Sequence, residues 1–362
     1  MLLSKILPGT GRGTAPEGRG GGGPPRGISV WRAPSTKLRL VPLPVPGRIC
    51  GATLLALLPI PALAAPDVTI DDSNVFPESI AADAAGNLYA SSFKGVIYRA
   101  PARSTKAVAW IRPDDTNKLL WTLGVLPDER SNSLWVCSTP VGFLTPPRPG
   151  EAAVVAFDLK TGAFKARYPL PAPADGKPAA AVVCNDMAVG QYGKLYITDT
   201  GAGRLLSLAP NAKAVTVETA DPLLVGVEGP AFSADNILYV NNTRQNSILR
   251  VNRKSDGSFE SLTKLTTSIP LNGPDALRPY KGNSFLQAET GGKGRATLVT
   301  ISGDHADVKI LSDDTGGGAA ITHIGDIFYT VPGKIQYLFD PSLKGKDPGA
   351  FVIKAMPIGG AQ

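Results

Sequence analysis

Histidine and cysteine are scarce in this sequence of 362 residues. It contains two histidines and three cysteines. His305 and His323 do not have the spacing of metal ligands, so an imidazole-rich zinc site and a Ser-His-Asp triad are both poorly supported. Cys137 and Cys184 are the only cysteines after residue 65, and two cysteines do not make a disulfide framework. An exported chain could pair these two cysteines, but we expect both thiols to be free and buried.

The sequence also has no apolar run long enough to span a bilayer and no long stretch of helical periodicity. The run at residues 49–58 is shorter than the roughly 18 residues that a spanning helix needs. It follows Arg48 and precedes the small-residue sequence ALAA at residues 62–65, which is typical of a cleavage site. We expect a signal peptide at residues 48–65, and a periplasmic or secreted protein without a membrane anchor after cleavage.

The formal net charge of +7 arises before Pro66. Eight of the 37 Lys and Arg lie there but only one of the 30 acidic residues, Glu17, which leaves 29 of each sign in residues 66–362. A neutral chain gives no reason to expect a nucleic-acid partner. Residues 1–47 are rich in Gly, Pro and Arg and are expected to be a disordered leader. We expect the true translation start to lie downstream of Met1.

A short apolar strand that follows a turn recurs along the chain. Its centres are separated by 46, 61, 43, 47 and 42 residues and lie at Leu88, Leu134, Leu195, Leu238, Phe285 and Ile327. A period in the forties built from short strands is typical of a propeller with one blade per repeat. The sequence therefore predicts an all-β fold over residues 66–362: a six-bladed β-propeller with four-stranded blades around a central channel. A strand near Val68 should pair with the last blade.

Each repeat contains further strand patterns after the central strand. Third strands are expected at residues 95–100, 154–159, 204–209, 247–252, 297–302 and 335–340. Fourth, outer strands are expected at residues 107–111, 164–170, 214–220 and 307–312. A β-sandwich or a two-domain α/β protein would explain neither the period nor the missing helices.

The residues ten positions before each strand centre should lie at the same distance from the propeller axis and at the same level along it. In chain order these residues are Glu78, Gly124, Asn185, Glu228, Asp275 and Gly317. The phase corresponds to the first residue of the innermost strand, which lines the channel. Four repeats thus aim an oxygen-bearing side chain at one axis, and two repeats supply only backbone.

Three carboxylates that point into one channel would repel one another unless a cation lay between them. Ligand sets made of oxygen alone select hard cations. We therefore expect one divalent cation, Ca²⁺ in the first place, with Mg²⁺, Mn²⁺ or Zn²⁺ as alternatives. The glycine-rich segments at residues 198–203 and 290–294 follow second strands without a helix, so they are expected to be hairpin loops rather than phosphate-binding loops.

Four motifs carry a resemblance to a known family. They are PES at residues 77–79, CNDMAV at 184–189, EGPAFSADNILYV at 228–240 and GPDALR at 273–278. The sequence resembles the senescence marker protein/gluconolactonase/luciferin-regenerating-enzyme-like (regucalcin-like) family of six-bladed propellers, over essentially all of residues 66–362.

This resemblance implies roles for the residues in common phase. It implies that Glu78, Glu228 and Asp275 bind one divalent cation in the channel. Asn185 would lie beside that cation and face the substrate, and Asp275 would be the general base. Two positions depart from the family pattern: Glu228 stands where an asparagine is usual, and Val183 replaces an arginine that holds substrate in sugar lactonases. The second change argues against aldonolactone substrates.

We expect an exported, divalent-metal-dependent hydrolase that cleaves a small-molecule lactone or related ester by metal-activated water, with Asp275 as the base. One alternative is a non-catalytic propeller with a structural Ca²⁺ that binds a ligand or a protein. The other is a metal-free propeller similar to strictosidine synthase. The sequence sets no oligomeric state.

Two long connections account for the 61-residue spacing. They lie at residues 138–152 and 171–181, and strand direction places both on the face of the channel that carries the acidic residues. Long loops in compact domains are commonly functional lids. We expect the first loop to contact substrate through Phe143.

Overall fold

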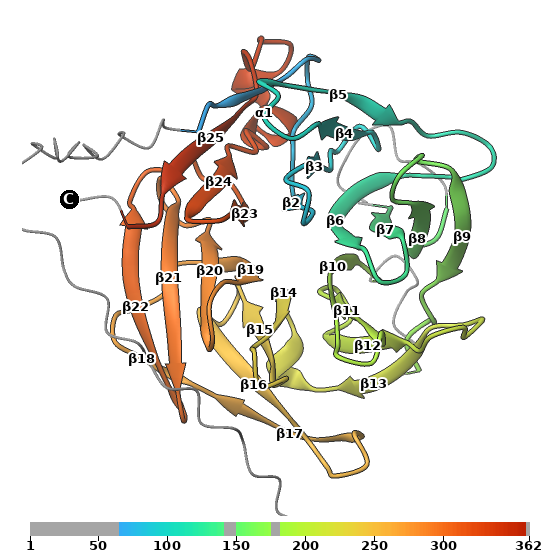
Figure 1. The fold of residues 1–362 in the computed structure, drawn as a ribbon, viewed down its shortest axis with the longest axis vertical. Coiled ribbons are helices and arrows are strands. Elements are labelled where there is room, and N and C mark those ends of the chain that lie inside the picture. The colour runs from blue at the N-terminus through green and yellow to red at the C-terminus, as the bar shows by residue number, and fades with distance from the viewer. Residues whose placement is uncertain (1–64, 141–149, 175–181, 360–362) are drawn as a thin grey trace, which may run out of the picture. The chain divides into compact units, whose positions relative to one another are not determined.

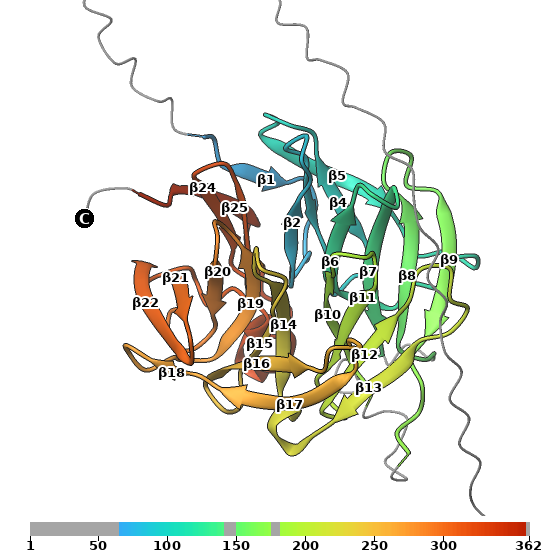
Figure 2. The same ribbon diagram turned by 60° about the horizontal axis from the view of Figure 1, so that its bottom comes forward.

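The structure is a computed structural model that describes residues 65–140, 150–174 and 182–359. The chain divides into two units, Met1–Ile60 and Pro61–Gln362, and the described residues all lie in the second. In that unit, twisted antiparallel sheets are arranged around one axis (Figures 1 and 2). The expected all-β propeller is thus confirmed. No helix in the described ranges is long and apolar enough to cross a membrane.

Three consecutive sheets are simple four-stranded meanders in which each strand pairs with the next. The first comprises β6 (Trp121–Asp128), β7 (Ser133–Thr139), β8 (Ala153–Asp158) and β9 (Phe164–Pro169). The second comprises β10 (Cys184–Val189), β11 (Leu195–Asp199), β12 (Arg204–Leu208) and β13 (Thr216–Ala220). The third comprises β14 (Val227–Phe232), β15 (Leu238–Asn242), β16 (Ser247–Arg253) and β17 (Phe259–Lys264).

The next sheet adds a fifth, short strand at its outer edge. Its strands are β18 (Thr266–Thr267), β19 (Pro274–Pro279), β20 (Ser284–Glu289), β21 (Arg295–Ser302) and β22 (His305–Ser312). The strands nearest the axis are β6, β10, β14 and β19, and the strands β9, β13, β17 and β22 lie toward the outside (Figure 1). Outer strands alternate between exposed and buried residues, as β22 does from His305 to Lys309, because only one of their faces packs against a neighbour.

The remaining strands form one eight-stranded sheet that joins the two ends of the described chain. Its order is β2 (Ile80–Ala82), β3 (Leu88–Ala90), β4 (Ile97–Ala100), β5 (Lys106–Ile111), β1 (Val68–Ile70), β25 (Val352–Pro357), β24 (Ile327–Val331) and β23 (Ala320–Ile324). Val68 pairs with Ile353 in antiparallel register, and Thr69 pairs with Lys106 in parallel register. The expected pairing of a strand near Val68 with the last sheet is confirmed.

The expected third strand at residues 335–340 is wrong. That segment forms a short helix, α1 (Gln336–Phe339), which is followed by the 3₁₀ turn η3 (Pro341–Leu343). The partner of β24 is instead β25. Apolar runs of this length do not distinguish a strand from a helical turn, and Tyr337 and Leu338 pack on the buried core from the helix.

Hydrophobic side chains of neighbouring sheets pack against each other. One cluster joins Tyr89 of β3 to Val136 of β7, and another joins Tyr239 of β15 to Phe285 of β20. The Tyr239 and Phe285 rings meet edge to face, with centroids 5.5 Å apart. The core is therefore distributed between the sheets, and it holds their innermost strands in fixed positions around the axis.

Cys137 and Cys184 form a disulfide with a Cα–Cα distance of 5.2 Å. The expectation of two free thiols is wrong. Burial was predicted correctly, since both residues are fully buried. The residues lie on β7 and β10, in neighbouring sheets, and the sequence alone did not show that those two strands face each other. The bond links two sheets covalently through β10, the innermost strand that carries Asn185, at the residue directly before Asn185.

Candidate functional site

Three of the predicted site residues occupy the same position in successive innermost strands. Asn185, Glu228 and Asp275 each follow the first residue of β10, β14 and β19, where the register to the second strand shifts. Such a β-bulge re-aims side chains and is common beside functional sites. The repeated bulge is therefore the local device that directs these three side chains to one place.

The phase predicted for the second repeat was wrong by one residue. The bulge in β6 lies between Thr122 and Val125, and Leu123 rather than Gly124 lines the central cavity. Leu134 pairs with Pro127, seven positions before it, whereas Leu195 pairs with Val189, six positions before it. The hairpin after β6 is therefore one residue longer, which shifts the count. Gly124 has a different role, because a Cβ there would lie 2.5 Å from the backbone oxygen of Asn185. Only glycine permits this close approach of the two innermost strands.

All four predicted polar residues line one cavity of about 870 Å³. Glu78 precedes β2, and the other three lie in β10, β14 and β19. The predicted backbone position Gly317 lines the same cavity. Apolar residues complete the described wall, and they include Phe93, Leu123, Val183, Val225, Ile335 and Phe339. Phe143, expected to contact substrate, lies outside the described residues.

Polar side chains at the ends of second strands fix the backbone that leads into the site. Asp199 accepts a hydrogen bond from Val183 N (2.9 Å), two residues before Asn185. Glu289 accepts one from Asn272 N (2.6 Å), three residues before Asp275. Asp199 also forms a buried ion pair with Arg204, and Glu289 forms an ion pair with the partly exposed Arg295. The approach to both site residues is therefore held by charge-assisted hydrogen bonds.

Within the cavity, Asn185 and Glu228 are in direct contact. The Nδ2 atom of Asn185 donates a hydrogen bond to Oε2 of Glu228. The same oxygen accepts from Thr200 Oγ1 at 3.4 Å, and Thr200 Oγ1 also donates to Val227 O at 2.5 Å. These contacts leave the amide oxygen of Asn185 available to a ligand.

Burial and the charges of neighbouring carboxylates raise the pKa of three carboxyl groups in the cavity. Burial, with the charges of Asp275 and Asp186, raises the pKa of Glu78 well above its ordinary value. Burial and the charges of Asp275, Glu78 and Asp186 do the same to the pKa of Glu228. Burial and the charge of Asp186 raise the pKa of Asp275 to about 7, although Arg278 lowers it in part. The cavity therefore favours either bound protons or a bound cation.

A buried ion pair beside the site was not predicted from the sequence. Arg278 Nη1 donates to Asp186 Oδ2 at 2.6 Å, and Arg278 Nη2 donates to Ser79 Oγ at 3.2 Å. Asp186 and Ser79 directly follow Asn185 and Glu78, so one guanidinium ties two site-bearing segments together. Asp186 lies in the motif CNDMAV, and Arg278 lies in the motif GPDALR. A charge inside an otherwise apolar strand was the signal that could have revealed them.

The donor chemistry of the cavity fits a hard divalent cation, but its spacing is not that of an assembled ion site. In residues 65–140, 150–174 and 182–359, no three His, Cys, Asp or Glu side chains are grouped closely enough to hold an ion. Glu228 accepts from Asn185 instead. The metal-ligand roles of Glu78, Glu228 and Asp275 therefore stay a prediction, supported by their shared cavity and by pKa values that burial and neighbouring charges raise.

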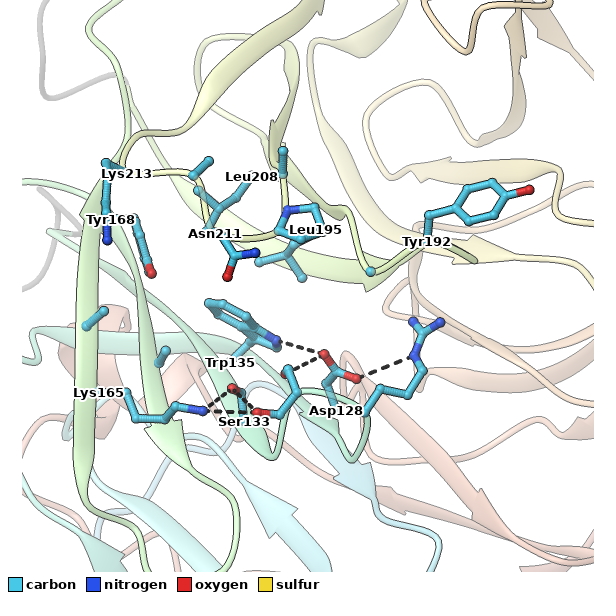
Figure 3. Close-up of a pocket in the computed structure, with 18 of the residues that line it drawn as sticks. Asp128, Ser133, Trp135, Lys165, Tyr168, Tyr192, Leu195, Leu208, Asn211 and Lys213 are labelled. Atoms are coloured by element: carbon cyan, nitrogen blue, oxygen red, sulfur yellow. Dashed lines mark hydrogen bonds and ion pairs between the residues drawn. The ribbon is translucent and has the colours of Figure 1, made fainter.

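A second hollow, of about 770 Å³, lies between the β6–β9 sheet and the β10–β13 sheet (Figure 3). Trp135 and Tyr168 line it, with Asp128 and Lys165 below them. Two of its charged groups already have partners: Asp128 Oδ2 accepts from Ser131 Oγ at 2.6 Å, and Lys165 Nζ donates to Ser133 Oγ at 2.8 Å. This hollow therefore offers less chemistry than the central cavity.

Comparison with known proteins supports the fold. The family described as "Strictosidine synthase-like, N-terminal" matches residues 62–100, about a tenth of the chain. No curated protein matches. The resemblance stated from the sequence is confirmed by solved structures, which include a gluconolactonase from Xanthomonas campestris and the calcium-binding protein regucalcin from Agrobacterium tumefaciens.

These similarities are distant. The gluconolactonase is 16% identical with a TM-score of 0.55, and the match covers 81% of this chain and 98% of that one. Regucalcin is 16% identical with a TM-score of 0.53, covering 82% and 96%. A virginiamycin B lyase from Staphylococcus aureus is 15% identical with a TM-score of 0.51, covering 73% and 80%. At such identities the likeness establishes the fold, and the activity has to be argued from the site.

Proposed function

We propose that this protein is a divalent-metal-dependent hydrolase of a lactone or related ester. The observation that carries the proposal is the convergence of Glu78, Glu228, Asp275 and Asn185 on one cavity, where burial and neighbouring negative charges raise the pKa of the three carboxyl groups. The similarity to a gluconolactonase and to calcium-binding regucalcin supports the choice of reaction and of Ca²⁺.

The chain's own residues would divide the work of ester hydrolysis. Glu78, Glu228 and Asp275 would hold the cation, which supplies positive charge that polarises a carbonyl and makes water more acidic. Asn185 would orient the substrate through its amide oxygen. Asp275, or a water that it activates, would take the proton as the water oxygen bonds to the carbonyl carbon. The bond between the carbonyl carbon and the ester oxygen would then break, and the departing alkoxide would take the proton back from the base to become an alcohol. The acid formed would release its own proton to solvent and leave as a carboxylate.

Metal analysis of the purified protein, combined with a panel of lactones and aryl esters, tests this proposal. We expect one equivalent of Ca²⁺, turnover that chelator abolishes, and stabilisation by about 2.7 kcal/mol at a Ca²⁺ concentration one hundred times Kd. Hydrolysis that persists unchanged in chelator would contradict the metal role. Binding of Ca²⁺ without turnover of any ester would leave a non-catalytic, ligand-binding propeller.

A metal-free reaction is the second candidate, because the strictosidine synthase-like match covers the segment that contains Glu78. In that case a carboxyl group with a raised pKa would act as an acid or base without a cation. Chelator-treated protein distinguishes the two, since only the metal-free enzyme would keep its activity.

We propose further that the propeller has six blades and that the chain is exported. The eight-stranded sheet would count as two blades, because only the parallel pairing of β1 with β5 joins its halves. Export rests on the signal-like residues 48–65, with residues 1–47 as a leader and 66–362 as the propeller. The Cys137–Cys184 disulfide supports it, since such bonds persist in oxidising compartments. N-terminal sequencing of the secreted or periplasmic protein tests the cleavage site.

A further inference from the structure

Arg244 supplies the only basic side chain among the described residues that line the central cavity. It lies in the turn between β15 and β16, and it is exposed. Among the described residues, no hydrogen bond or ion pair engages its guanidinium group. The acidic residues of the same cavity therefore do not pair with the guanidinium group of Arg244, which is available to bind a ligand.

The turn that carries Arg244 is fixed to the segments that carry two of the carboxylates. Thr243 N donates to Gly226 O at 3.1 Å, and Thr243 Oγ1 donates to Pro274 O at 2.7 Å. Gly226 and Pro274 lie close in sequence to Glu228 and Asp275. Gly226 has a φ of +89°, and a Cβ there would lie 2.5 Å from the Cβ of Arg244. The Arg244 side chain therefore starts from a rigid point beside the carboxylates.

Large apolar side chains remain exposed on the same cavity wall. Ile335 is 42% exposed and Phe339 is 44% exposed, and both line the cavity from the segment around α1. Val183 adds a further apolar contact. An exposed apolar surface within a cavity is typical of a ligand-binding site. The wall therefore suits a molecule with an apolar body.

We propose that Arg244 recognises a carboxylate on an otherwise apolar ester or lactone, and so determines which substrates the site accepts. A planar guanidinium matches a carboxylate through two parallel hydrogen bonds. A singly charged group is favoured over a phosphate, because Glu78, Glu228 and Asp275 would repel a second negative charge more strongly. Arg244 would hold the charged end at the turn while the ester carbonyl reaches the carboxylates. This substrate class rests on the proposed hydrolase function, whereas the binding of the carboxylate does not.

Calorimetric titration with a matched pair of unreactive ligands tests the binding step. 4-Acetamidobenzoate carries a carboxylate on an apolar ring, and 4-acetamidobenzamide is its neutral counterpart. In the presence of Ca²⁺ we expect the wild type to bind the benzoate about tenfold more tightly, the effect of one charge-assisted contact at a partly exposed site. Arg244→Gln should lose this preference, and Arg244→Lys should keep part of it. Lys213→Gln removes a positive charge outside the cavity and should keep it fully.

Turnover of the corresponding esters separates this inference from the proposed reaction. With 4-acetoxybenzoate, Arg244→Gln should lower kcat/KM about tenfold, mainly through KM, whereas 4-acetoxybenzamide should be cleaved as by the wild type. If neither ester is cleaved but the binding preference follows Arg244, the hydrolase proposal fails and the carboxylate site stands. If esters are cleaved and the preference is absent, or survives in Arg244→Gln, the carboxylate site is wrong.

Discussion

Asp275 is one of three buried carboxyl groups, with Glu78 and Glu228, whose raised pKa should make the stability of the cation-free protein depend on pH. Its pKa is about 7 in the folded protein and about 3.9 in an unfolded chain. Between these values the folded state binds more protons, so the free energy of unfolding should fall as pH rises from about 4 to 7 and stay low above that. Melting temperatures measured in chelator across this range should therefore decrease.

Asp275→Asn should flatten this decrease and raise the melting temperature at pH 8 in chelator. The charge of Asp275 raises the pKa of both Glu78 and Glu228, so its removal relieves both carboxylates. The same variant should lose turnover and the stabilisation that Ca²⁺ gives. Asp313→Asn, a change of an exposed residue away from the cavity, is the matched control. Equal pH profiles for Asp275→Asn and wild type would contradict the assignment.

The buried pair of Arg278 and Asp186 should matter much more than a pair on the surface. Arg278→Met leaves Asp186 buried without its partner, which should cost about 3–5 kcal/mol in the free energy of unfolding. Adding Asp186→Asn should recover much of that loss. Lys281→Met breaks the exposed pair with Asp326 and should change stability little. Urea unfolding of the four proteins checks this, and equal losses for the two single variants would refute it.

Sequence reasoning identified the site residues that follow a regular count and missed those that do not. Asn185, Glu228 and Asp275 lie ten residues before a strand centre because their hairpins have equal length. The hairpin after β6 is one residue longer, so the ten-residue count selected Gly124 although Leu123 is the residue that lines the cavity. Asp186 and Arg278 are 92 positions apart, so only the folded arrangement of the strands shows that they meet.

At the scale of elements, the innermost strands of neighbouring sheets are held together by close backbone approach and by one covalent bond. A Cβ at Gly229 would lie 2.4 Å from the backbone nitrogen of Leu277, as at Gly124 beside Asn185. β10 is additionally bound to β7 by the Cys137–Cys184 disulfide. The site therefore depends on strand-to-strand contacts that tolerate no added side chain.

Removal of the disulfide should destabilise the protein without displacing the site. The two cysteines are separated by 47 residues, and a closed loop of that length restricts the unfolded chain by about 4 kcal/mol in the chain-entropy model. We expect the Cys137→Ala/Cys184→Ala protein to lose about that much in urea unfolding while it still binds Ca²⁺. Wild type treated with reductant should behave alike, and an unchanged midpoint in both would contradict the prediction.

The strand pattern could be predicted from the sequence wherever turns and alternation are local. The central strands at Leu88, Leu195 and Ile327 are present, because a turn followed by alternating apolar residues is a short-range signal. The last repeat failed at residues 335–340, since the partner of β24 comes only after the α1 segment. No local signal shows that β25 rather than the nearest apolar run completes a sheet.

At the scale of the whole molecule, β1 joins the two ends of the described chain. It pairs with β25 on one side and with β5 on the other, and Thr69 N donates to Thr105 O at 2.9 Å. Val68 and Ile70 point into the core, with 3% and 2% of their surfaces exposed. Three residues therefore hold the eight-stranded sheet together.

Thr69→Pro should weaken this connection, because proline has no N–H to donate to Thr105 O. We expect a loss of about 1–3 kcal/mol in the free energy of unfolding and faster proteolysis of β25. Thr69→Val keeps the N–H and suits a strand, so it should match the wild type in both measurements. If proline at this position left both unchanged, β1 would not be essential to the sheet.

The pairing of Val68 with Ile353 also determines when the protein can finish folding. Its partners are 285 positions apart, so the ribosome must have released almost the whole chain before this contact can form. A nascent chain would expose one edge of β1 throughout synthesis, because β25, its partner on that side, is made last. Unpaired strand edges invite aggregation. If the chain is exported, as proposed above, the late arrival of β25 would keep the sheet open during synthesis, and an unfolded chain is the form that a general secretion channel accepts.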